Sequence, residues 1–118
     1  MVEFVAYLLF AVGIGHMITG LRSYRAPLAA MLREGFINAL RPHLERRAAF
    51  WFILFSVIFF MAGQITLHAA KTGDTYLLKV IGWYFFAIGA IGVMAMPKSP
   101  FWIGLVVSLI LLCSGYGL

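Results

Sequence analysis

Two side chains near the first apolar segment could together donate and accept a proton. His16 lies six residues before Arg22, so it is roughly 9 Å along a helix from the end of that segment. Small residues such as Gly20 share its helix face, so we expect His16 to face other helices, where an ionisable group is a functional candidate. The carboxylates that follow it are Glu34 and Glu45. If the loop carrying Glu34 folds back under the helices, His16 and Glu34 become a candidate acid and base. The alternative is that His16 is neutral and forms a hydrogen bond with another helix.

Four more residues complete the set of candidate ligand-binding side chains. Asn38 follows Glu34 by four residues, which on a helix places both in one polar cluster where Asn38 would orient a substrate. A solvated polar face is the alternative for these two residues. Arg46 and Arg47 could bind an anionic headgroup or a phosphate, or could be the basic charges that stop translocation of a span. Trp51 belongs to an aromatic anchor beside these arginines, as is usual at a membrane interface.

The sequence has no motif that indicates a metal or a cofactor. No pair of His, Cys or carboxylate residues has metal-ligand spacing, and there is no Walker loop, dinucleotide fingerprint, nucleophile elbow or haem-type histidine pair. Gln64 and His68 share one helix face. Because Gln64 is roughly 25 Å along a helix from Arg47, we expect it near the opposite leaflet from His16, bonded to another helix. The single Cys113 excludes an internal disulfide.

The composition places these residues in a membrane protein. Hydrophobic residues make up 64% of the 118 residues and charged residues only 11%, whereas soluble domains carry about a quarter charged residues. The mean hydropathy is +0.99. Apolar stretches of about the length that crosses a ~30 Å hydrocarbon core occur at residues 2–21, 48–70, 76–96 and 101–116, the last slightly short. We therefore predict an all-α fold, a single membrane domain built as an integral membrane four-helix bundle.

The loop between the first two expected spans is basic and predicts a helix of its own. Apolar residues at helical spacing favour an amphipathic cytoplasmic helix over residues 27–41, lying in the headgroup region. Pro27 suits its first turn and Pro42 would end it. A re-entrant helix that closes the bundle is the alternative. The loop holds six of the nine Lys and Arg residues, namely Arg22, Arg25, Arg33, Arg41, Arg46 and Arg47.

The positions of the basic residues predict an orientation. Lys98 lies on the same side as the basic loop, and Lys71 and Lys79 lie on the other. The positive-inside rule therefore places the loop in the cytoplasm and both termini outside, in a multi-pass protein of the cytoplasmic (inner) membrane. The net charge of +5 then favours the lipid bilayer and its anionic headgroups as partners, rather than nucleic acid.

Stripes of small residues predict how the helices pack. Ala6, Gly13 and Gly20 recur every seven residues, as do Gly82 and Gly89. The last span carries a further stripe of Gly104, Ser108, Leu111 and Gly115. Small residues on one stripe let membrane helices approach closely, which indicates a compact bundle. The same stripes could instead form a homodimer or a larger membrane complex.

Three blocks of the sequence resemble a known group of proteins. They are Gly13-x-Gly15-His16, then Arg33-Glu34-Gly35-Phe36 with Asn38, then Arg46-Arg47-Ala48-Ala49-Phe50-Trp51-Phe52. Over nearly the whole chain, these blocks and their spacing resemble a bacterial family of small four-span membrane proteins known only as a domain of unknown function. The resemblance implies four helices and a cytoplasmic membrane location, and it implies no activity. The size and number of spans are also similar to the DoxX-like families, which is a likeness of architecture alone.

Three classes of function are compatible with these features. The first is a protein that binds a lipophilic molecule or a partner membrane subunit at the cytoplasmic leaflet, and we favour it because no catalytic motif is present. The second is a small membrane-embedded isomerase, hydrolase or cyclase that uses His16 and Glu34 as acid and base. The third is a small transporter. Small four-span exporters carry a glutamate inside the first span, whereas the only first-span acid here is Glu3, at its very end.

Overall fold

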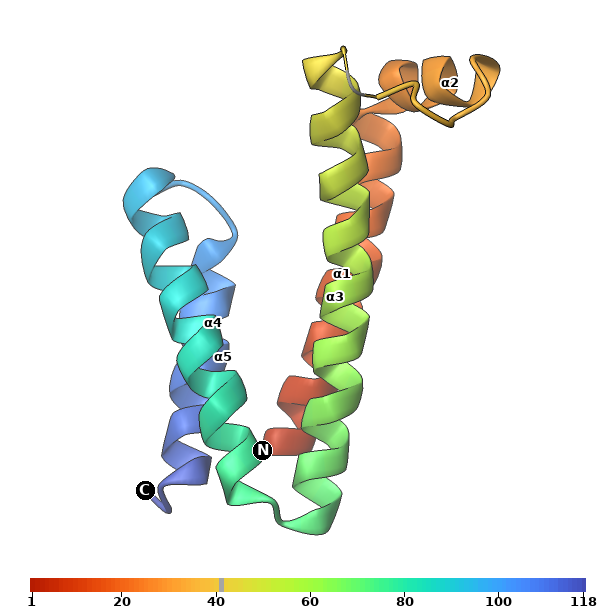
Figure 1. Cartoon of the computed structure of the whole chain (residues 1–118). Helices are drawn as coiled ribbons and strands as arrows, with labels where there is room; N and C mark the ends of the chain where they lie inside the picture. Colours follow the sequence, from red (N-terminus) through yellow and green to blue (C-terminus); the bar gives the residue numbers. More distant parts are fainter. Residues whose placement is uncertain (41) are drawn as a thin grey trace. The chain divides into compact units, whose positions relative to one another are not determined.

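The structure is a computed structural model that describes residues 1–40 and 42–118. Arg41, one of the six basic residues of the loop, lies outside the described residues. The described residues form five helices and no strand (Figure 1): α1 Val2–Ser23, α2 Arg25–Arg33, α3 Leu44–Thr72, α4 Thr75–Ala95 and α5 Phe101–Gly115. The all-α prediction is confirmed.

Three of these helices are long and apolar enough to cross a membrane. They are α1, α3 and α4, with 22, 29 and 21 residues. Within the most apolar 18-residue stretch of each helix, only 28% of the residues of α1, 22% of those of α3 and 22% of those of α4 are buried. Side chains such as Ile14 and Ile91 are 53% and 67% exposed, as expected for helices that have lipid as their solvent. Helix α5 has 15 residues, about 22 Å of rise, which is shorter than a ~30 Å hydrocarbon core.

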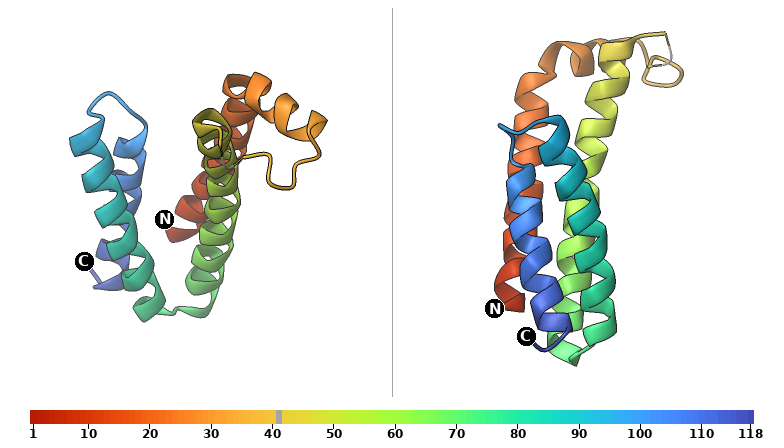
Figure 2. Two further views of the ribbon diagram at one scale, coloured as in Figure 1. Left: turned by 45° about the horizontal axis from the view of Figure 1, so that its top comes forward. Right: turned by 90° about the vertical axis from the view of Figure 1, so that its left-hand side faces the viewer.

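The chain divides into two compact units, and α1 packs on α3 in the unit of residues 9–61. In Figure 1 α1 lies partly behind α3, and the right-hand view of Figure 2 shows the two helices next to each other. A Cβ atom on Gly13 would lie 2.8 Å from the Phe60 ring, and one on Gly20 would lie 2.7 Å from Phe52. Glycine at both positions therefore permits the contact. The close approach that the seven-residue spacing predicts for Gly13 and Gly20 is confirmed here.

The other unit comprises residues 1–8 and 62–118 and contains the pair α4 and α5. Val107, Ser108 and Leu111 of α5 are fully buried, with 0% exposure. A Cβ atom on Gly89 of α4 would lie 2.9 Å from the backbone nitrogen of Leu105. The backbones of α4 and α5 therefore approach closely at this point, which explains why the third and fourth apolar segments carry small residues at regular intervals.

Helix α2 is shorter than the helix expected over residues 27–41, because Gly35 ends it. Gly35 has φ 91°, in the left-handed region where a Cβ atom is unfavourable. Its N–H donates to the carbonyl of Leu32 (3.3 Å), and the N–H of Phe36 donates to the carbonyl of Met31 (2.8 Å). This pair of bonds is a Schellman motif, which satisfies the last carbonyls of the helix. Glu34 is consequently the C-terminal cap of α2, and Asn38, with φ 58°, lies beyond its end.

Helix α3 begins at Leu44, four residues before the expected span at residue 48. Arg46 and Arg47 are therefore helical and lie in its first turn. The helix ends at Thr72, and Gly73, with φ 69°, follows in the left-handed region. The N–H of Asp74 then donates to the carbonyl of Ala69 at 3.0 Å, and the Asp74 carboxylate accepts a bond from the Leu77 N–H that caps α4.

Candidate functional site

His16 is held between α1 and α3 by a hydrogen bond and by ring stacking. Its Nδ1 lies 3.0 Å from Oγ of Ser56, and Ser56 is fully buried. The imidazole stacks on the Phe52 ring at a centroid distance of 3.8 Å and an interplanar angle of 10°. The Phe59 ring is tilted against the imidazole, and the two ring centroids are 5.5 Å apart. His16 therefore faces the neighbouring helix, as expected, and its polar partner is a serine hydroxyl.

Glu34 pairs with Arg46 rather than with His16. The Arg46 guanidinium donates to the Glu34 carboxylate and also to the carbonyl of Ala39 at 2.8 Å. The Arg46 side chain is 12% exposed and that of Glu34 is 53% exposed. The hydrogen bond from Arg46 is the main cause that lowers the pKa of Glu34 below its ordinary value. Arg46 thus ties the loop that follows α2 to the first turn of α3.

The structure does not join the expected acid and base. Among the described residues, no hydrogen bond or ion pair links His16 with Glu34, since each has its own partner. Asn38 is exposed and lies beyond the end of helix α2. It therefore does not share the helix face with Glu34 that the spacing of four residues predicts. Arg47 is exposed. Trp51 is 60% exposed and lies edge-on to Phe50 at 5.6 Å.

A pocket lies where α2 faces the start of α3. Its volume is about 550 Å³. One wall is formed by small apolar residues of α2, and the other comes from the residues that lead into α3. The lining residues are Ala26, Pro27, Ala30, Pro42, His43, Leu44, Glu45 and Arg46. The second wall carries His43, Arg46 and the carboxylate of Glu45. Small apolar side chains facing polar and charged ones suit a molecule that has an apolar body and a polar head.

The described arginines of the basic loop differ in their exposure, and only Arg46 among them lines the pocket. Arg22, Arg25, Arg33 and Arg47 are exposed, whereas Arg46 is largely covered and already bonded to Glu34. The exposed arginines are therefore the groups that can contact an anion. The first N–H groups of α3 also lack partners within their helix, as at any helix start, and such groups add to the attraction of an anion.

Sequence reasoning missed two of these features. Ser56 was not among the candidates, although a serine within an apolar run is a signal that it bonds another helix. The partner of Glu34 was also missed, because Arg46 is twelve residues away and meets Glu34 only after the chain turns at Gly35. The signal available there was Gly35 itself, which is the residue type that most often follows a helix end.

Comparison with known proteins places the chain in a family. Residues 1–116 match the model of a family described as a family of unknown function (DUF6463), and the chain belongs to it. No curated protein and no solved structure matches the chain. The family covers nearly the whole chain, in agreement with the uncharacterised family that the sequence blocks resemble.

Proposed function

We propose that the protein is a multi-pass membrane protein that binds an acidic amphiphile, a molecule with an apolar body and an anionic head, at its basic loop. The observation that supports this function best is the pocket of about 550 Å³ between α2 and the start of α3. Ala26, Pro27 and Ala30 would contact the apolar body. His43 and the exposed Arg25 and Arg47 nearby in the sequence would contact the head, with the N-terminal turn of α3.

The ion pair between Glu34 and Arg46 supports this proposal as a positioning contact. It holds the loop residues 34–39 against α3 through two bonds from one guanidinium, to Glu34 and to the carbonyl of Ala39. Phe36 adds an aromatic contact with Phe50 at 6.5 Å. A loop that is fixed before the ligand arrives loses less conformational entropy on binding.

The proposal includes an arrangement in the cytoplasmic membrane of a bacterium. In it, α1, α3 and α4 span the bilayer, and α5 completes a four-helix bundle with some thinning of the bilayer around its short length. Helix α2 lies in the headgroup layer, with its apolar face toward the lipid. The basic loop is cytoplasmic and both termini are outside, because the loop arginines and Lys98 outnumber Lys71 and Lys79.

The enzyme and transporter alternatives have less support. Acid–base catalysis by His16 and Glu34 requires the two groups to share a substrate, and the structure gives them separate partners. A partner membrane subunit is the alternative occupant of the basic end.

Retention of a defined anionic lipid tests the proposal. The purified full-length protein in neutral detergent would be mixed with phosphatidylglycerol or with phosphatidylcholine, and bound lipid counted by native mass spectrometry. We expect retention of phosphatidylglycerol, and Arg47→Gln should weaken it about fivefold, since a basic group near an anionic surface contributes ~1 kcal/mol. Ala30→Phe should fill the pocket and reduce lipid retention. Lys98→Gln removes one positive charge elsewhere in the chain and should leave retention unchanged, so it is the control for Arg47→Gln. Equal retention of both lipids by wild type and Arg47→Gln would contradict the proposal.

A further inference from the structure

Two polar side chains, Gln64 and His68, are exposed on one face of the apolar helix α3. They are four residues apart, and both are exposed. Among the described residues, neither side chain has a hydrogen-bond or ionic partner. Thr72 donates to the backbone carbonyl of His68 and not to its imidazole. The sequence predicts that Gln64 bonds another helix, and the described helices of one chain do not supply that bond.

The depth of Gln64 makes an unpartnered amide unfavourable in the membrane arrangement proposed above. In that arrangement, Arg47 in the first turn of α3 lies at the cytoplasmic headgroups. Gln64 follows Arg47 by seventeen residues, which is about 25 Å along a helix and therefore still inside a ~30 Å hydrocarbon core. His68 lies one turn further on, at the outer boundary. Lipid tails offer no hydrogen bond to an amide, so we expect a polar partner on this face.

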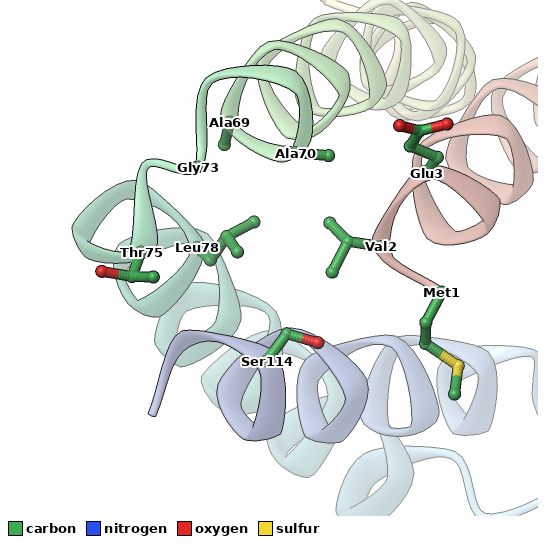
Figure 3. Close-up of a pocket in the computed structure, with 9 residues that line it drawn as sticks. All are labelled: Met1, Val2, Glu3, Ala69, Ala70, Gly73, Thr75, Leu78 and Ser114. Carbon is green, nitrogen blue, oxygen red and sulfur yellow. The ribbon is translucent and has the colours of Figure 1, made fainter. Parts of the chain in front are cut away.

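The polar face of α3 lies opposite the face that is buried in its own unit. Thr66 and Ala69 of α3 are fully buried, with 0% exposure. Ala69 also lines an opening that the end of α3 shares with residues of α1, α4 and α5 (Figure 3). Gln64 and His68 are each two residues from Thr66, which is about 200° around a helix. The helices of the same unit therefore cover the Thr66 side and leave the Gln64 side free for a partner.

Apolar side chains continue the polar face along the same helix. Val57 and Met61 are each 54% exposed. The row Val57, Met61, Gln64 and His68 has intervals of four, three and four residues, the spacing with which two membrane helices pack at a small left-handed crossing angle. Lys71 follows at the helix end, where its long side chain can extend to the headgroups. The row offers a second helix a contact about 16 Å long.

We propose that this row of four residues joins two copies of the chain in a parallel, two-fold symmetric dimer. Two copies in one membrane have the same orientation, so a two-fold axis along the membrane normal brings each residue of α3 to its own counterpart. The carboxamide of Gln64 has both a donor and an acceptor, as has a neutral imidazole at His68, so each can bond its counterpart. A second copy thus supplies the polar partner that lipid lacks. The proposal rests on α3 spanning the membrane, and it is independent of the ligand at the basic loop.

Cysteine cross-linking in native membranes tests the dimer. In a Cys113→Ser background, membranes that contain the full-length protein would be washed with alkaline carbonate and then oxidised. We expect Val57→Cys and Met61→Cys to give covalent dimers with the mass of two copies. Phe55→Cys is the control, because Phe55 is 45% exposed but lies on the other side of α3. Loss of the protein in the wash would overturn both the membrane arrangement and the dimer. Retained protein without dimers, cross-links only to other proteins, or equal dimers at Phe55→Cys would overturn the dimer alone.

Two substitutions of Gln64 test the hydrogen bond itself. Energy transfer between copies labelled at the exposed Cys113 would be measured in phosphatidylcholine vesicles over a range of protein-to-lipid ratios. Gln64→Leu should weaken the dimer about tenfold, since it removes a polar pair from each copy, whereas Gln64→Asn keeps the carboxamide and should retain most of the affinity. Ala30→Phe, in the pocket beside α2, should leave energy transfer unchanged. Wild-type protein without energy transfer, or a Gln64→Leu dimer as strong as wild type, would overturn the proposal.

Discussion

His16 of α1 and Ser56 of α3, forty residues apart in the chain, meet through a 3.0 Å hydrogen bond between Nδ1 and Oγ. Ser56 is fully buried, and the same imidazole stacks on Phe52, one turn before Ser56 on α3. This contact favours one register of the two helices, because a shift of either helix would leave a buried hydroxyl unpaired.

A double-mutant cycle should reveal the energy of that contact. Ser56→Ala and His16→Phe, singly and together, would be compared by unfolding in a graded detergent mixture. Polar pairs between membrane helices couple by about 0.6 kcal/mol, and we expect a value of this size, because phenylalanine keeps the stack on Phe52 and removes only the hydrogen bond. Strictly additive effects of the two substitutions would contradict an energetic role for the bond.

Two glycines that face each other between α4 and α5 should respond differently to alanine. A Cβ atom on Gly89 would lie 2.9 Å from the backbone nitrogen of Leu105, whereas the nearest atom to one on Gly104 is 3.7 Å away. Gly89→Ala should therefore lower the free energy of unfolding by about 1–2 kcal/mol through overpacking. Gly104→Ala should be neutral or slightly stabilising, because alanine favours helix.

Leucine at these sites extends the comparison. Gly89→Leu and Gly104→Leu should each lower the thermal midpoint in detergent more than Val106→Leu, since Val106 is 54% exposed. Equal effects at all three positions would mean that this face contacts lipid rather than the partner helix.

The ion pair between Glu34 and Arg46 should make stability depend on pH in the acidic range. The hydrogen bond from Arg46 lowers the pKa of Glu34 in the folded protein. The pair therefore stabilises the fold fully at pH values above the usual glutamate pKa of about 4.3, and the stabilisation is lost as the pH falls through the lowered value. The difference in thermal midpoint between wild type and Glu34→Gln should shrink over that window. In an Arg46→Gln background the difference should be absent at every pH.

Cysteine accessibility should establish the orientation. In a Cys113→Ser background, Lys71→Cys at the end of α3 should react with a membrane-impermeant maleimide added to intact cells. Ile37→Cys, which replaces a residue that is 82% exposed, should react only after permeabilisation, because the loop is expected in the cytoplasm. The region of Arg41 is expected to behave like Ile37. Labelling of Ile37→Cys in intact cells would reverse the orientation.

The amino-acid sequence by itself determined the all-α class and the helices that can enter a membrane. Hydropathy and helix length are local, additive properties, so long apolar runs such as those in α1 and α3 are recognisable without any tertiary contact. The close contacts at Gly13 and Gly20 were predictable for a related reason, since a seven-residue spacing places small residues on one helix face. The end of α2 at Gly35 was not predicted, since the expected helix ran to residue 41, although a glycine is a local signal for a left-handed helix end.

Only the tertiary structure decided which polar groups meet. His16 could pair with a carboxylate or with a hydroxyl on another helix, and the register of α1 against α3 selects Ser56. Glu34 could face His16 or a basic residue, and the turn at Gly35 brings it to Arg46. Such choices depend on the positions of atoms that are twelve to forty residues apart in the chain. A periodic pattern within one helix carries no information on them, because it specifies a face of that helix and not the residue that the face meets.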